Sequence, residues 1–145
     1  MEVLFKLVSD AQASLFVLFQ KTWIYHWDVV GPNFHQLHTL FGEQYNTMFE
    51  EIDKLTEHMR YLGMKPVSGL SRVIEVSSIV EADSGISSMD MISQLMQDNQ
   101  RLIEMFSIIS EEADNQKQYA TANIVQEFME NHGKFVWMLR SFFEE

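Results

Sequence analysis

The chain has 145 residues with no cysteine, and its formal charge of −11 comes from 21 acidic and 10 basic residues. That length suits one domain with its own core, and the absence of cysteine excludes disulfides and thiolate metal sites, leaving His, Asp and Glu as strong metal ligands. No apolar run reaches the roughly 18 residues of a membrane span, and no basic leader precedes an apolar stretch, so we expect a cytoplasmic protein.

The first predicted helix runs from the N-terminus to about residue 30 and carries two apolar stripes. The first stripe steps by four and three residues, through Leu4, Val8, Ala11, Leu15 and Leu18. The second lies beside it and consists of Phe16, Phe19, Trp23 and Trp27. Together they form an arc wider than one core needs. The second stripe therefore either contacts another subunit or lies deep in the helix's own bundle.

Gly31-Pro32-Asn33 predicts a turn and the start of a second helix. The apolar face of this helix consists of Phe34, Leu37, Phe41, Met48, Ile52, Leu55, Met59 and Leu62. Gly63 suits the position just after the helix end, and Pro66 follows it. Residues 65–87 are rich in serine and short aliphatic clusters, which predicts a linker long enough to cross the bundle and to include a short helix.

Ser88 is the predicted cap of a third helix, and the polar residues 111–118 predict the next break. The apolar face of the third helix consists of Ile92, Leu95, Leu102, Phe106 and Ile109. The fourth helix places Ile124, Phe128, His132, Phe135, Leu139 and Phe142 on one side. Two short connections and one long central crossover predict an all-α, ferritin-like four-helix bundle whose second and third helices run parallel.

Asp53 and Glu57 are the carboxylates that best suit a metal site. They are four residues apart, so they share one helix face and could hold one cation. Such pairs are also common on solvated helices. The metal interpretation gains support from His26 and His38, which lie upstream in the same helical hairpin, whereas His35 better suits a surface position.

The spacing of these groups makes a sharper prediction. His38 and Asp53 lie fifteen positions apart on one predicted helix, or about 22 Å along its axis. They cannot meet at one metal within a single chain. If both are ligands, the site must form across a two-fold interface, where a reversed second copy brings carboxylates to imidazoles.

The internal di-iron site of ordinary ferritins is disfavoured by an absence in the sequence. Such sites use Glu-x-x-His on two helices of one bundle. None of the five histidines has a glutamate three residues before it. His132, on the apolar side of the fourth helix, is accordingly predicted to be a hydrogen-bonded core histidine.

The segment from His26 to His38, HWDVVGPNFHQLH, resembles a characteristic stretch of the Dps (DNA-protection-during-starvation) family of mini-ferritins. The patterns Asp53-x-x-x-Glu57, Arg60-x-x-Gly63 and Trp137-Met138-Leu139-Arg140 are similar to that family as well. The resemblance covers nearly the whole chain, in order and spacing, and implies a single ferritin-like domain over residues 1–145.

Membership of that family implies a hollow dodecamer with ferroxidase centres at its two-fold interfaces. The resemblance makes Asp53 and Glu57 the acidic iron ligands, with His26 completing the main site and His38 the weaker second site. Trp27 is similar to a tryptophan that intercepts oxidising radicals beside the centre. The implied function is oxidation of Fe(II) by hydrogen peroxide or dioxygen, storage of the ferric mineral and protection from oxidative damage. Zinc or another divalent metal is an alternative occupant.

Two departures from the family pattern qualify this expectation. Gly42 stands where the family has an aspartate near the second iron, and Glu43 is turned about 100° around the helix from it. Tyr119 and Asn123 replace two acids of the family's iron-entry pore, of which Asp114 is kept. Direct DNA binding is not expected, because no Lys-rich tail is present and an acidic chain repels phosphates.

Three functions remain open at this point. The first is the ferroxidase and iron store just described. The second is a metal-sequestering shell with weak or no ferroxidase activity, because Gly42 removes a ligand. The third is a structural helical protein whose histidines are incidental.

Overall fold

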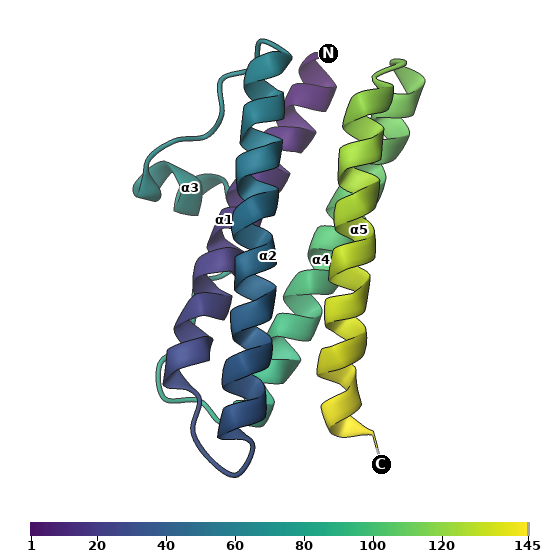
Figure 1. The fold of residues 1–145 in the computed structure, drawn as a ribbon. Coiled ribbons are helices and arrows are strands. Elements are labelled where there is room, and N and C mark those ends of the chain that lie inside the picture. Colours follow the sequence, from purple (N-terminus) through teal and green to yellow (C-terminus); the bar gives the residue numbers. More distant parts are fainter. Residues whose placement is uncertain (145) are drawn as a thin grey trace.

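The computed structural model describes residues 1–144. Its long helices are α1 (Glu2–Asp28), α2 (Phe34–Tyr61), α4 (Ser88–Asn115) and α5 (Tyr119–Arg140), which run side by side along one axis (Figure 1). A short helix, α3 (Leu70–Val76), lies in the connection between α2 and α4, and a 3-10 turn, η1 (Ser141–Phe143), follows α5. None of the helices within residues 1–144 is both long and apolar enough to cross a bilayer.

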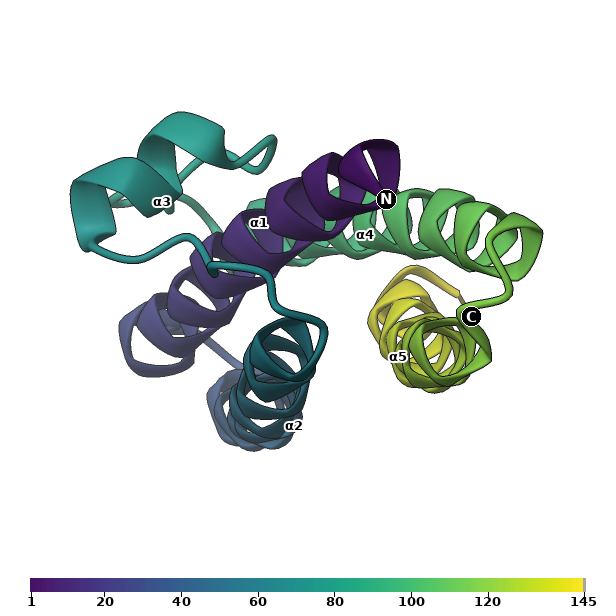
Figure 2. The same ribbon diagram turned by 90° about the horizontal axis from the view of Figure 1, so that it is seen from above.

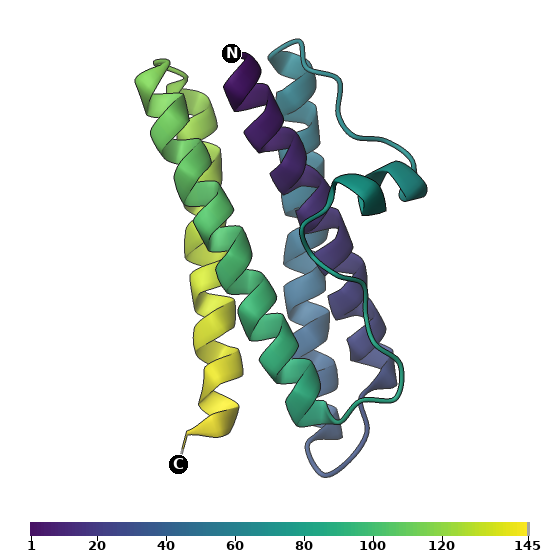
Figure 3. The same cartoon turned by 180° about the vertical axis from the view of Figure 1, so that it is seen from behind.

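The four long helices form two antiparallel hairpins, α1 with α2 and α4 with α5 (Figure 1). The crossover leaves the end of α2, passes outside α1 and returns to the opposite end of the bundle before α4 begins (Figure 3). Seen along the axis, α3 lies against α1 on the side away from α5 (Figure 2). α2 and α4 therefore run parallel, as predicted for a ferritin-like bundle.

The predicted apolar faces pack into a common core, except at Phe34, which was predicted to be on the apolar face of α2 but is exposed at the start of that helix. The first stripe of α1 is buried along its whole length, as are the inward positions of α2, α4 and α5. Phe106 and Phe128 meet edge to face in the α4–α5 hairpin, with ring centroids 5.6 Å apart. Removal of these apolar surfaces from water is the main force that holds the helices together.

Two predicted helix boundaries were wrong. The cap of α4 is Ser87 rather than Ser88: the Ser87 hydroxyl oxygen accepts a hydrogen bond from the Asp90 amide at 3.1 Å, and Ser88 is already helical. The predicted break at 111–118 is shorter, because α4 continues to Asn115 and buries Ala113 in the core. Polar residues on the outer face of a helix do not interrupt it when the inner face still packs.

The end of α2 confirms the prediction made for Gly63. Gly63 has a φ of 82°, in the left-handed region that glycine tolerates. Its amide donates to the Arg60 carbonyl at 3.0 Å, and the Met64 amide donates to the Met59 carbonyl at 2.8 Å. This glycine-terminated motif satisfies carbonyls that the helix leaves free and turns the chain into the crossover.

Polar side chains of α1 hold the crossover in place. The Gln12 amide nitrogen donates to the Val67 carbonyl at 3.0 Å, and the Val67 amide donates back to the Gln12 oxygen at 2.9 Å. Farther along, the Lys21 ammonium donates to the Val80 carbonyl at 3.0 Å and pairs with Asp98 of α4 at 2.8 Å. A long connection without strands or long helices of its own is thereby fixed to a rigid element.

Candidate metal centre

His26 and His38 face each other across the α1–α2 hairpin. Their rings stack with centroids 3.8 Å apart and an interplanar angle of 17°. The Nδ1 atom of His26 donates to the His38 carbonyl oxygen at 2.5 Å, and the Nδ1 atom of His38 donates to the His26 carbonyl oxygen at 2.7 Å. Each histidine is therefore positioned by the backbone of the other.

These reciprocal hydrogen bonds assign the tautomer of both rings. A carbonyl oxygen can only accept, so the proton must be on Nδ1 in each neutral imidazole. The lone pair then lies on Nε2, which is one of the two nitrogens through which histidine binds metals. A backbone carbonyl that orients the ring in this way is the usual support of a metal-binding histidine. The two rings thus offer two oriented nitrogen donors.

Gly42 lies directly beside this pair. A Cβ atom built on Gly42 would stand 3.1 Å from both Cε1 and Nδ1 of His26. The ring of Tyr45 meets that of His26 edge to face, with centroids 5.2 Å apart. A side chain at position 42 would therefore reach the histidine pair, and the glycine leaves that place without a donor.

The carboxylates predicted as ligands lie elsewhere on the same helix. Asp53 and Glu57 are both exposed, one turn apart on α2, and α2 is continuous from Phe34 to Tyr61. The fifteen positions between His38 and Asp53 therefore correspond to about 22 Å of helix. Within residues 1–144 no group of three or more His, Asp or Glu side chains could hold a metal ion. One chain supplies two halves of a donor set but does not bring them together.

Asp53 lies on the wall of an apolar groove between α1, α2 and α3, which we call the α1–α2–α3 groove. Its volume is about 520 Å³, and its apolar lining consists of Phe16, Phe19, Phe49, Ile52, Leu70 and Val73. Phe49 is 62% exposed. Large exposed apolar surfaces are uncommon on monomeric proteins and usually mark a binding surface.

The second stripe of α1 can now be assigned. Phe16 and Phe19 are half-buried at the groove, whereas Trp23 and Trp27 are 41% and 53% exposed. Trp23 stacks on Tyr45 of α2 and contacts the edge of Trp27. The interpretation that this stripe lies deep in its own bundle is therefore wrong. Contact with another subunit stays as a prediction.

His132 is a core histidine, as predicted, and it belongs to a polar network that the sequence did not reveal. Its Nδ1 donates to Asn99 Oδ1 at 2.7 Å, because the Asn99 amide group already donates to the Leu95 carbonyl. Its Nε2 lies 2.7 Å from Glu51 Oε1, and Asn131 donates to the other Glu51 oxygen at 3.1 Å. His132 and Glu51 thus form a buried polar pair between α5 and α2.

The remaining candidates occupy the surface. His35 is exposed, as predicted. Also exposed are Glu43 and the three residues named for the entry pore, Asp114, Tyr119 and Asn123. Nothing in the structure explains why Tyr119 and Asn123 replace acids there. Phe49 was missed from the sequence because it lies outside the predicted apolar face of α2. The available signal was an aromatic residue directly before two acidic residues, Glu50 and Glu51.

An up-down, crossover, up-down bundle with parallel second and third long helices defines a ferritin-like protein. The family model of the ferritin-like domain matches residues 5–145. The chain is similar to the crystal structure of a Dps protein from Bacillus brevis, with 33% identity, a TM-score of 0.95 and coverage of 99% of this chain and 96% of that one. This chain belongs to the Dps family of ferritin-like proteins.

Other proteins are similar to this chain as well. The structure of Dps from Thermosynechococcus elongatus has a TM-score of 0.96 at 26% identity, covering 99% of this chain and 92% of that one. The DNA protection during starvation protein 2 of Bacillus anthracis is 42% identical over 84 residues, or 58% of this chain and 55% of that protein. A low temperature-induced protein of Nostoc is 37% identical over 75 residues, or 52% of this chain and 42% of that protein. The aligned segments thus span about half the length of these two relatives.

Proposed function

We propose that this protein oxidises and stores ferrous iron at sites shared between two copies of the chain. Asp53 and Glu57 of one copy would meet His26 and His38 of its partner, and dodecameric assembly would enclose the stored ferric mineral. The observation that carries the proposal is the separation of His38 from Asp53 and Glu57 along the single continuous helix α2. Neither half completes a site alone, and a reversed second α2 would bring each half against the other.

The α1–α2–α3 groove supports pairing through the same face. Asp53 belongs to its wall, so a partner seated in the groove would lie against the acidic half-site. In a two-fold pair, His26 of one copy would meet Asp53 in the groove wall of the other copy. The exposed Trp27 next to that His26 would therefore approach the same groove. Exposed aromatic side chains are enriched at such interfaces.

The donor set suits Fe(II) as the substrate. Carboxylates and imidazoles bind this borderline cation, and the Nδ1 hydrogen bonds of both histidines leave Nε2 as the metal-binding atom. Hydrogen peroxide accepts one electron from each of two Fe(II) ions and, with two protons, leaves as two water molecules. The ions become ferric, and the reactants of hydroxyl-radical chemistry are removed together.

Co-assembly of two inactive variants tests the shared site. One variant carries His26→Ala and His38→Ala, and the other carries Asp53→Asn and Glu57→Gln. Each alone should lack rapid ferric absorbance after anaerobic Fe(II) loading and addition of peroxide. Unfolded together and refolded at equal amounts, they should regain about one quarter of the wild-type activity, because half of the pairs are mixed and each mixed pair rebuilds one of its two sites.

A site confined to one chain cannot be rebuilt in this way. Mixed assemblies that remain as inactive as either parent would therefore refute the shared site. Glu50→Gln, an exposed acid on α2 between Phe49 and the buried Glu51, serves as the matched control and should keep wild-type activity.

A second function is favoured by the position of Gly42. A side chain there would reach His26, and glycine supplies no donor. A protein with fewer donors at the second position would sequester one metal per shared site and oxidise it slowly. Anaerobic titration with Fe(II), followed by addition of hydrogen peroxide, separates the two functions: two ions bound per subunit with fast oxidation by the peroxide supports the ferroxidase, and one ion with slow oxidation supports sequestration.

A further inference from the structure

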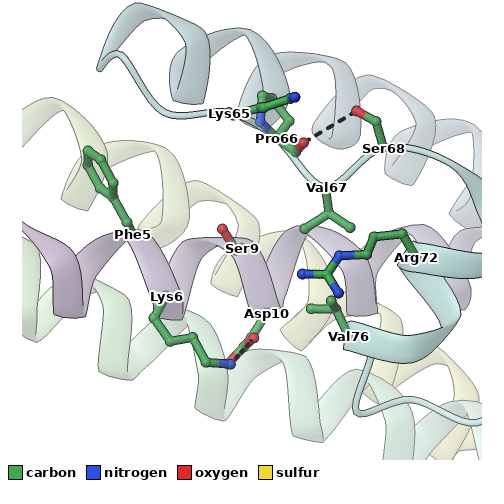
Figure 4. Close-up of a pocket in the computed structure, with 10 residues that line it drawn as sticks. All are labelled: Phe5, Lys6, Ser9, Asp10, Lys65, Pro66, Val67, Ser68, Arg72 and Val76. Carbon is green, nitrogen blue, oxygen red and sulfur yellow. Dashed lines mark hydrogen bonds and ion pairs between the residues drawn. The ribbon is translucent and has the colours of Figure 1, made fainter.

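A second pocket lies between the N-terminal half of α1, the segment 65–68 and α3 (Figure 4). Its volume is about 630 Å³, within the range of roughly 300–1,000 Å³ typical of small-molecule sites. It shares Val67 and Ser68 with the α1–α2–α3 groove but contains neither half of the proposed metal site. Its chemistry is consequently independent of the proposed function.

Positive charge is concentrated in this pocket. Lys6, Lys65 and Arg72 line it, and the chain has only 10 basic residues in a net charge of −11. Asp10 also lines the pocket, but both of its carboxylate oxygens accept from the Lys6 ammonium, at 2.7 and 2.9 Å. The Lys6 ammonium is thereby engaged by both oxygens of Asp10, whereas Lys65 and Arg72 keep N–H donors for a ligand.

These two cations keep free donors. Arg72 pairs with Glu75 through Nη1 alone, at 3.2 Å, so its Nε and Nη2 protons remain available. Lys65 forms no ion pair with the residues that the structure describes. Figure 4 shows Arg72 reaching from α3 over α1, with the Ser9 hydroxyl on the α1 side of the pocket. Figure 4 draws Lys65 beside Pro66 and the Arg72 guanidinium on the other side of Val67, so the Lys65 side chain would have to swing toward Arg72 to share a ligand. The free guanidinium and ammonium donors suit a phosphate.

The rest of the pocket is apolar and well held. Phe5, Val67 and Val76 contribute carbon surface, and the backbone of Val67 is held on both sides by Gln12. The volume exceeds what a bare phosphate ion needs. A ligand that uses the whole pocket would place an apolar body against these side chains and its anionic group near Lys65 and Arg72.

We propose that this pocket binds a small organic phosphate, with Arg72 and Lys65 holding the phosphate and Phe5, Val67 and Val76 contacting the organic part. Both cations are solvent-exposed, so the expected affinity is modest and falls as salt rises. Phenyl phosphate is a suitable probe, because it combines one phosphate with one apolar ring.

Isothermal titration of the assembled protein with phenyl phosphate at low salt tests the proposal. Wild type should show saturable binding, tighter than for inorganic phosphate or for phenol. Lys65→Gln with Arg72→Gln should weaken the binding by about fivefold or more. The matched control removes the same charge elsewhere: Arg101→Gln with Lys134→Gln, whose cations also pair with nearby glutamates at 3.5 and 3.3 Å. It should change the affinity by less than about twofold.

Three results would overturn the proposal. The first is the absence of saturable binding to wild type. The second is equal weakening in both double variants, since the effect would then be one of overall charge. The third is equal affinity for inorganic phosphate and phenyl phosphate, which would show that the apolar side chains of the pocket do not contact the organic part of the ligand.

Discussion

The histidine pair shows how single residues prepare a site before any ligand binds. Two carbonyl oxygens, one at the end of α1 and one in α2, assign the Nδ1 protons of His38 and His26. The cost of orienting the rings is therefore met on folding rather than on binding. This arrangement depends on the close approach of the two helices beside Gly42.

The two helical glycines, Gly42 and Gly133, should respond differently to substitution by alanine. Glycine to alanine inside a helix stabilises by up to about 1 kcal/mol. A Cβ on Gly133 meets nothing within 4 Å, so Gly133→Ala should gain that amount. A Cβ on Gly42 would crowd the His26 ring at 3.1 Å, so Gly42→Ala should gain less or lose stability.

Urea unfolding midpoints at one protein concentration would measure the difference between these variants. An equal gain for both would show that the His26 ring moves aside without cost. The imidazole NMR signals of His26 should shift in Gly42→Ala and stay unchanged in Gly133→Ala.

His58 should make stability depend on pH. Burial lowers the pKa of His58 below its ordinary value of 6.5, and its Nε2 lies 2.8 Å from the Thr121 hydroxyl. As the pH falls through that value, the unfolded chain takes up the proton before the folded chain does. The contribution of His58 is thus complete above the unfolded pKa and is lost as the pH falls toward the folded pKa.

Unfolding midpoints measured at about pH 7.5 and about pH 5.5 would test this. The loss on acidification should be smaller in His58→Gln than in wild type. The exposed His35 provides the control, because His35→Gln should keep the wild-type loss. Equal losses in all three proteins would contradict the prediction.

At the scale of elements, the crossover is held to the long helices by polar contacts. The Tyr25 hydroxyl accepts from the Asp83 amide at 3.1 Å and donates to Gln94 at 2.5 Å, and burial raises the pKa of this hydroxyl. Together with Gln12 and Lys21, it fixes both halves of the crossover to α1. One wall of the α1–α2–α3 groove is held through these contacts.

Gln12→Ala should loosen this wall. It leaves the amide and carbonyl of Val67 without their partner, which costs about 1–3 kcal/mol where water cannot replace it. Gln126→Ala removes an exposed bond to Ser110 of 2.9 Å and should change stability by less than about 0.5 kcal/mol. Hydrogen exchange at the Val67 amide should accelerate in Gln12→Ala only. Unchanged protection there would contradict the assigned anchor.

The boundaries of the elements show where reading the sequence succeeds and fails. The end of α2 was predictable because Gly63 has a backbone requirement that few residues meet. The start of α4 was misplaced by one residue because Ser87 and Ser88 are chemically equal as caps, and only the backbone conformation selects between them. The end of α4 lies later than predicted because polar residues on the outer face do not interrupt a helix whose inner face, here Ala113, still packs in the core.

At the scale of the whole molecule, the α1–α2–α3 groove should govern assembly. Phe49→Arg would place a charge on this exposed apolar face, and burying an unpaired charge in an interface is costly. Light scattering should show smaller species than wild type, and ferric absorbance should fall with them. Phe49→Leu keeps an apolar side chain and should assemble normally. Normal assembly of Phe49→Arg would exclude this face from the interface.

Much of the candidate site was predictable from the sequence, and its arrangement was not. The residue types and spacing of His26, His38, Asp53 and Glu57 indicate metal chemistry from the sequence. The stacking of the rings, the approach of Gly42 to His26 and the exposure of Phe49 depend on how α1 packs on α2. Local patterns carry no information on such packing distances.

The sequence alone determined the helices, their order and the distance between the two half-sites. Apolar periodicity assigns the inner face of each helix, and the constant rise of a helix converts residue number into length. Tertiary structure decided which donors face each other, how the crossover is anchored and where the apolar groove lies. Those features arise from contacts between residues far apart in the chain, and the free energy of such contacts depends on packing that no short segment specifies.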